Sequence, residues 1–155
     1  QQIDALIPQM ELAFELELPV IIHCRDAANE MLEICNDLSK KGKCPQGVLH
    51  CWTGTPKEME QFLDLGFYIS FSGIVTFPKA YEIHECAKSV PSNKYLVETD
   101  SPFLAPVPFR GKRNEPSYVK SVAQAIALLR STELVTVAKE TSENAEKLFK
   151  FNLVK

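Results

Sequence analysis

Short apolar runs alternate along this chain with longer stretches in which apolar residues recur every three or four positions. The short runs predict β-strands, and the longer stretches predict amphipathic helices before the first strand and after every strand, with two helices at the end. Because the short runs are mostly apolar on both faces, they indicate parallel strands buried between layers. The predicted strands cover residues 20–24, 48–51, 67–71 and 95–100.

Several residue types mark where the helices begin and end. Thr55 and Glu58 have the spacing of a capping box, which predicts a helix start directly after the threonine. We expect Asp26 to cap the helix after the first strand, and Pro78 to open the helix after the third strand. The Thr-Ser pair at residues 141–142 predicts a break or a new cap within the last helix.

Strands that alternate with helices indicate an α/β fold, for which two architectures are open. Four strand-helix units can form a small doubly wound sheet or half of a (β/α)8 barrel, which needs about 250 residues when complete. The first helical pattern begins at residue 1 without a cap or an initiator methionine, so we expect a missing preceding segment. We therefore interpret residues 1–155 as a single, partial domain.

The composition is typical of a soluble globular protein and argues against several classes of site. The chain has 155 residues, is 45% hydrophobic, and carries a net charge of −3, which gives no general attraction to nucleic acid or membranes. Its five cysteines lack a Cys-x-x-Cys pair, which argues against a disulfide framework or a thiolate zinc site. A reducing compartment, the cytoplasm or alternatively the nucleus, fits best. No apolar run approaches the roughly 18 residues of a membrane span.

Chemically active side chains gather where the predicted strands end. His23 and His50 close the first two strands, and the fourth carries Glu98 and Asp100 on one face, because side chains alternate along a strand. In a barrel, we expect His23, His50 and Asp100 to converge. Imidazole and carboxylate ligands suit Zn, Mn or Mg, and such an ion lowers the pKa of bound water for hydrolysis. For each histidine alone, a hydrogen-bonded core residue is the alternative.

Residues near these strand ends have both structural and functional interpretations. Arg25 can hold the carboxylate of Glu98 or a substrate phosphate. Trp52 can stack on a nucleic-acid base or only cover the core. The loop at residues 109–116 carries three cationic side chains that lie near the expected site or are simply solvated. His84 lies within a predicted helix and is interpreted as a surface or packing residue.

Five blocks of the sequence, taken together, resemble successive motifs of the TatD family of metal-dependent deoxyribonucleases. They follow the family's order over most of the chain, at residues 21–27, 49–54, 66–73, 96–102 and 110–116. The resemblance implies a (β/α)8 barrel that binds one to three divalent ions at the carboxyl ends of its strands. It also implies hydrolysis of phosphodiester bonds in DNA, often from the 3′ end.

The resemblance implies roles for individual residues of this chain. His23 and His50 correspond to metal ligands, and Asp100 corresponds to an aspartate that contacts both metal and the attacking water. Glu98 and Arg25 fall at positions that support the ligands or contact phosphate. The remaining candidates for contact with the substrate or the ligands are Trp52, Arg113, Asn114 and Glu115.

Two motifs of the family are absent from this sequence: an initial Asp-x-His-x-His strand and a glutamate on the fourth strand of the barrel. The resemblance therefore implies the second half of a TatD-like (β/α)8 barrel, with four parallel strands and flanking helices. The first half would come from the parent polypeptide or from a second copy in a dimer, and we expect the parent polypeptide.

The expected function is divalent-metal-dependent hydrolysis of DNA, as a 3′–5′ exonuclease, an endonuclease or both, on a single-stranded substrate. One alternative keeps the metal and changes the ester, for example to aminoacyl-tRNA. Another alternative is a catalytically silent fragment or assembly partner that lacks the N-terminal ligands.

Overall fold

The structure is a computed structural model in which residues 1–151 are described, so the end of the expected 1–155 domain lies outside the described residues. Four strands form one parallel sheet in the order β1-β2-β3-β4. The predicted strands are confirmed in place, but the fourth ends at Val97 rather than at residue 100. Their bounds are β1 (Val20–His23), β2 (Gly47–His50), β3 (Tyr68–Phe71) and β4 (Tyr95–Val97).

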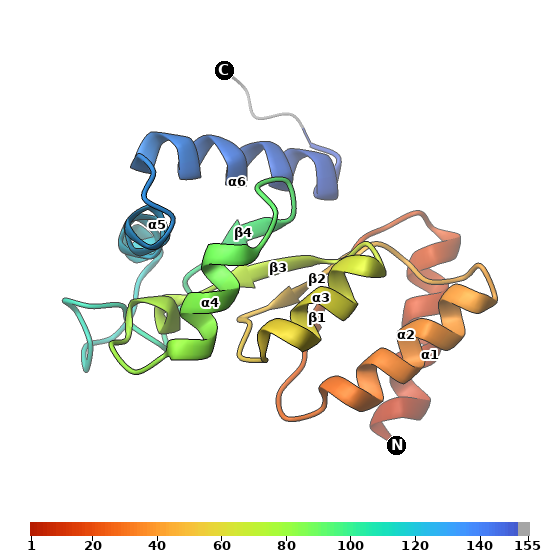
Figure 1. Cartoon of the computed structure of the whole chain (residues 1–155). Helices are drawn as coiled ribbons and strands as arrows, with labels where there is room; N and C mark the ends of the chain where they lie inside the picture. Colours follow the sequence, from red (N-terminus) through yellow and green to blue (C-terminus); the bar gives the residue numbers. More distant parts are fainter. Residues whose placement is uncertain (152–155) are drawn as a thin grey trace.

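Helices surround this sheet in the order that the periodicity predicts. They are α1 (Gln2–Glu15), α2 (Ala28–Lys40), α3 (Pro56–Asp64), α4 (Tyr81–Ser89), α5 (Val119–Leu129) and α6 (Leu134–Phe149), with 3-10 turns η1 (Gly73–Thr76) and η2 (Pro116–Tyr118). In Figure 1, α3 and α4 cover one face, α1 and α2 lie at the β1 end, and α5 and α6 lie at the β4 end. Within the described residues, no helix has the length and apolar character needed to cross a membrane.

The helix boundaries confirm one of the predicted signals and correct three. Helix α3 begins with a complete capping box, in which Thr55 and Glu58 satisfy each other's backbone N–H groups. Asp26 does not cap α2, because it has a positive φ of 52° and lies before Ala27, the N-cap residue. Helix α4 begins at Tyr81, beyond the predicted Pro78, because η1 and a turn precede it. The predicted break at residues 141–142 is wrong, since α6 runs through it and Thr141 Oγ1 donates to the Val137 carbonyl at 2.9 Å.

The main core lies between the sheet and the helices. Trp52 is part of it, at 3% exposure, and meets Phe62 edge-on with 5.9 Å between ring centroids. Its Nε1–H donates to Cys86 Sγ at 3.3 Å. Of the two interpretations of Trp52, base stacking is therefore wrong, because the ring is covered by the core that it completes. The sheet residues in this core include Ile22, Leu49, Ile69, Phe71 and Tyr95.

The opposite face of the sheet is covered only in part. Val48, Tyr68 and Leu96 form a second, smaller cluster with Leu148, which reaches this face from α6. Ile21 on β1 is 66% exposed on the same face. Between this face and α6 lies a cavity of about 380 Å³, whose lining includes His50 at the end of β2 and Glu98 after β4.

A buried amide joins α6 to the outer strand of the sheet. Asn144 is 5% exposed, and its Nδ2 donates to the carbonyl oxygens of Tyr95 at 2.8 Å and Ser92 at 2.9 Å. Strand β4 has β3 on one side only, so part of its backbone has no strand partner. Asn144 thus satisfies backbone carbonyls that a neighbouring strand does not reach.

We predict that Asn144→Ala lowers the free energy of unfolding by about 1–3 kcal/mol, because it removes the donor to the buried Tyr95 carbonyl and to the partly buried Ser92 carbonyl. Urea denaturation measures this change. The matched control is Asn29→Ala, at an exposed position in the first turn of α2, which should change the free energy by less than about 0.5 kcal/mol. Equal effects of the two substitutions would contradict this role of Asn144.

We also predict that stability falls in alkaline solution partly because of Cys86. Burial raises the pKa of this thiol from its ordinary 9.0 to about 11, although the hydrogen bond from Trp52 acts in the opposite direction. The folded state therefore keeps a proton that the unfolded chain loses, and this contribution is complete below pH 9.0 and disappears as the pH rises through about 11.

Urea denaturation between pH 8 and pH 11 tests this expectation by comparing the protein with Cys86→Ala. The difference in slope should approach about 1.4 kcal/mol per pH unit at most, since one proton is involved. Parallel pH profiles of the two proteins would show that Cys86 makes no such contribution.

Candidate functional site

The two predicted histidines lie side by side at the carboxyl ends of neighbouring strands. His23 ends β1 and His50 ends β2, and the parallel pairing places these two residues in register. Their ring centroids are 5.4 Å apart, and the ring planes are inclined by 40°. His23 is exposed, whereas His50 is half-buried. The structure thus brings these two histidines together, as their positions at the ends of predicted strands indicated.

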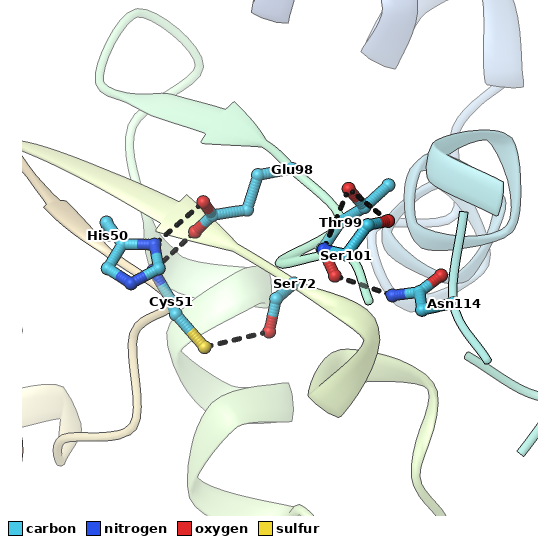
Figure 2. Close-up of polar contacts among 7 residues, drawn as sticks. All are labelled: His50, Cys51, Ser72, Glu98, Thr99, Ser101 and Asn114. Carbon is cyan, nitrogen blue, oxygen red and sulfur yellow. Dashed lines mark hydrogen bonds and ion pairs between the residues drawn. The ribbon is translucent and has the colours of Figure 1, made fainter. Parts of the chain in front are cut away.

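A carboxylate from the end of β4 fixes the orientation of His50. Glu98 directly follows β4, and its Oε2 lies 2.9 Å from His50 Nδ1, while its Oε1 accepts the backbone N–H of Cys51 (Figure 2). Because an ionised carboxylate only accepts hydrogen bonds, His50 donates from Nδ1 and keeps a lone pair on Nε2. Histidines that bind metals are usually oriented by such a contact on the other ring nitrogen.

Asp100 does not join the histidines in the way that the alternation predicted. Strand β4 ends at Val97, and Asp100 has a positive φ of 58°, so the regular alternation of a strand does not extend to this carboxylate. Asp100 lines a cavity of about 550 Å³ at the strand ends, together with His23 and Arg25. Within residues 1–151, no three His, Cys, Asp or Glu side chains are grouped closely enough to hold a metal ion. This part of the chain supplies a histidine pair and a separate carboxylate, and their metal-binding roles stay predictions.

The structure does not support one of the two interpretations of Arg25. Glu98 contacts His50 and Cys51, and no ion pair joins it to Arg25 among the described residues. The Arg25–Glu98 alternative is therefore wrong. Arg25 is exposed and lines the same cavity as Asp100, so contact with a substrate phosphate stays a prediction.

The loop after β4 is held together by Asn114, which the resemblance placed among the residues that contact the substrate or the ligands. This residue is 2% exposed, and its Nδ2 donates to the carbonyl oxygens of Thr99 at 2.7 Å and Phe103 at 2.6 Å. Direct contact of Asn114 with substrate is therefore wrong for this structure, because its amide is already used and covered. Its neighbours Arg113 and Glu115 are exposed, and their roles stay predictions.

The surroundings of Cys24 and Cys51, the thiols next to the histidines, raise their pKa and so disfavour the thiolate form that a nucleophile needs. Burial raises the pKa of Cys51, and the negative charges of Glu98 and Asp100 add to this effect, while the hydrogen bond between Cys51 and Ser72 and the charge of Arg25 oppose it. The Cys51 Sγ lies 3.2 Å from Ser72 Oγ (Figure 2). Thiols whose pKa is raised stay protonated near neutral pH. The interpretation of the cysteines as packing residues agrees with this environment.

His84 is half-buried, and its Nε2 lies 3.0 Å from the Val75 carbonyl oxygen, which confirms that it is a packing residue.

Phe103 was not among the predicted site residues, yet it lines the same cavity as Asp100 and is 68% exposed. The signal that could have identified it is an aromatic residue directly after Asp-Ser-Pro in a proline-rich loop, where no core position is expected.

Comparison with known proteins relates this arrangement to one family. The sequence pattern described as "TatD related DNase" matches residues 1–150. The Bacillus subtilis protein named "Uncharacterized metal-dependent hydrolase YabD" is 44% identical over 144 residues, which cover 93% of this chain and 56% of that protein. The Citrobacter rodentium protein named "3'-5' ssDNA/RNA exonuclease TatD" is 39% identical over 150 residues, covering 94% of this chain and 56% of that protein. The chain thus spans little more than half the length of these relatives.

Solved structures agree with the sequence comparison. The crystal structure of YJJV, a TatD homologue from Escherichia coli K12, is similar with a TM-score of 0.84 and 26% identity, over 93% of this chain and 54% of that chain. Together with the parallel sheet, this likeness confirms four strands and flanking helices of a TatD-like (β/α)8 barrel, rather than a doubly wound sheet. With a match that extends over nearly all of its residues, the chain belongs to the TatD-related DNase family.

Proposed function

We propose that the protein containing this chain is a divalent-metal-dependent hydrolase that cleaves phosphodiester bonds in single-stranded DNA. The proposal is carried by His50, which Glu98 holds through Nδ1 beside His23 at the carboxyl ends of parallel strands. In (β/α)8 barrels, active sites lie at this end of the strands. Relatives named metal-dependent hydrolase and ssDNA/RNA exonuclease support the choice of cofactor and substrate.

The residues of this chain fit a divalent ion in the kind of donor that they offer. His50 Nε2 and the exposed imidazole of His23 are nitrogen donors, and Asp100 supplies carboxylate oxygen from the adjoining cavity. Nitrogen and oxygen donors suit Zn, Mn or related ions, which take about four to six ligands. We propose that the remaining ligands come from residues outside this sequence, in the same polypeptide or in a second copy of the chain.

We propose a separate role in the reaction for each of Asp100, Arg25 and Glu98. A divalent ion held here would supply Lewis acidity, which polarises a phosphoryl group and makes water more acidic. Asp100 holds the attacking water and accepts its proton on a carboxylate oxygen. Arg25, exposed on the same cavity, binds a phosphate through paired N–H donors. Glu98 keeps the Nδ1–H tautomer of His50.

We predict that Asp100→Asn lowers the rate of nucleotide release from single-stranded DNA by at least about 100-fold, because an amide cannot accept the proton of the attacking water. The rate is measured with Mn²⁺ or Mg²⁺ on the protein that contains this chain. Asp64→Asn, at an exposed position at the end of α3, is the control and should leave the rate unchanged. Equal rates for all three proteins would rule out this role of Asp100.

The same preparation also separates the alternative functions. Release of the amino acid from aminoacyl-tRNA, without cleavage of DNA, would favour a metal-dependent hydrolase of another ester. Hydrolysis of neither substrate would favour a catalytically silent assembly partner, which the incomplete ligand set of the described residues also favours.

We further predict that Glu98→Gln weakens metal binding by about 10- to 100-fold. Glutamine has one acceptor oxygen, so it cannot accept from both His50 Nδ1 and the Cys51 N–H, as the two carboxylate oxygens do. Titration calorimetry with Zn²⁺ or Mn²⁺ measures the affinity. The control is Glu85→Gln, which removes an exposed ion pair with Lys88 on α4. If both variants bind the ion as tightly as the unchanged protein, Glu98 does not orient a ligand.

A further inference from the structure

Phe103 presents an aromatic ring to solvent from a segment whose backbone is fixed. Its N–H donates to the Asp100 carbonyl at 2.9 Å, and its own carbonyl accepts from Asn114 Nδ2 at 2.6 Å. Asn114 also donates to the Thr99 carbonyl, and its N–H donates to the Pro102 carbonyl at 3.1 Å. The backbone on both sides of Phe103 is therefore restrained, although the ring itself is 68% exposed.

The same segment also packs closely against η1. The Leu104 carbonyl oxygen would lie 1.8 Å from a Cβ at Gly73, so this approach requires a glycine. Three residues further on, the Val107 N–H donates to Thr76 Oγ1 at 2.9 Å. Contacts with η1 and with Asn114 thus hold both sides of the turn that carries Phe103. A ring on such a segment is preorganised, because binding would not have to order the loop.

The ring shares a cavity with two of the residues to which the proposed function gives a role. Phe103 lines the cavity of about 550 Å³ that also contains Asp100 and Arg25. It carries the one phenyl ring among the described residues that line this cavity, and Trp52 is buried in the core. A flat apolar face, the guanidinium of Arg25 and the carboxylates of Asp26 and Asp100 therefore surround one space. Base stacking and phosphate contact are the two interactions with which proteins bind single strands.

We propose that Phe103 stacks on a base of single-stranded nucleic acid next to the phosphate that is cleaved, while Arg25 contacts the backbone. This inference rests on the proposed function, and it specifies how the substrate is held. Because every base has a flat π-face, the contact favours single strands without selecting a sequence. In a duplex, the bases are stacked on one another and not available to the ring.

Equilibrium binding in the presence of a chelator tests the stacking without requiring cleavage. Fluorescence anisotropy measures the affinity of the protein containing this chain for an oligo-dT strand. Phe103→Ala should weaken binding by roughly 5- to 100-fold, and Phe103→Trp should restore it, because stacking on tryptophan is at least as favourable. The control is Tyr81→Ala, an aromatic residue on α4 that is 69% exposed and lies outside the cavity. Thermal denaturation shows whether each variant folds.

A set of strands with one abasic site at successive positions identifies the contact. At one position, loss of the base should weaken binding to the unchanged protein by about the same factor as Phe103→Ala does. Loss of the base at that position should not change the affinity of Phe103→Ala for the strand. Equal affinities of the unchanged protein and Phe103→Ala, or no binding of single strands at all, would overturn the stacking. Absence of metal-dependent cleavage despite such binding would instead contradict the proposed hydrolase and leave the stacking supported.

Discussion

Glu98 follows β4 and links the end of this strand to the ends of β2 and β3. Its backbone N–H donates to the Phe71 carbonyl of β3 at 3.0 Å, while its side chain passes to the end of β2 and contacts His50 and the Cys51 N–H. The Glu98 side chain is 24% exposed, so these charge-assisted hydrogen bonds are only partly screened by water. The orientation of His50, and with it the chemistry that we propose, depends on this contact.

Turns rather than strands build the rest of the site. Asp26, Cys51 and Asp100 each follow a strand and have positive φ angles of 52°, 50° and 58°, a region that non-glycine residues seldom adopt. Such turns aim side chains that a regular strand would send elsewhere, and strained backbone of this kind is frequent at functional sites. His23 comes from β1, which is one of the two outer strands, so the proposed metal site lies at an edge of the sheet.

The sequence was informative where a regular period controls the side chains. The apolar runs located the strands, and the parallel arrangement that they imply brought His23 and His50 together. The alternation of side chains along a strand did not predict the position of Asp100. Strand β4 ends at Val97, and no pattern in the sequence marks that end. The sequence could not separate the core position of Trp52 from an exposed one, since both follow a strand. Direct contact of Asn114 with substrate was a poor interpretation, because a polar residue in a charged loop gives no sign that its amide donates to two backbone carbonyls, whereas a supporting role for this residue stays a prediction.

The central claim is that His50 and His23 face one metal ion, with Glu98 behind His50. Anomalous X-ray scattering from crystals of the protein containing this chain, grown with Zn²⁺, tests this claim most directly. The account predicts a zinc peak about 2.0–2.1 Å from His50 Nε2, with His23 as a second ligand and Glu98 still bonded to Nδ1. A peak that involves neither histidine, or zinc bound to His50 through Nδ1, would contradict it.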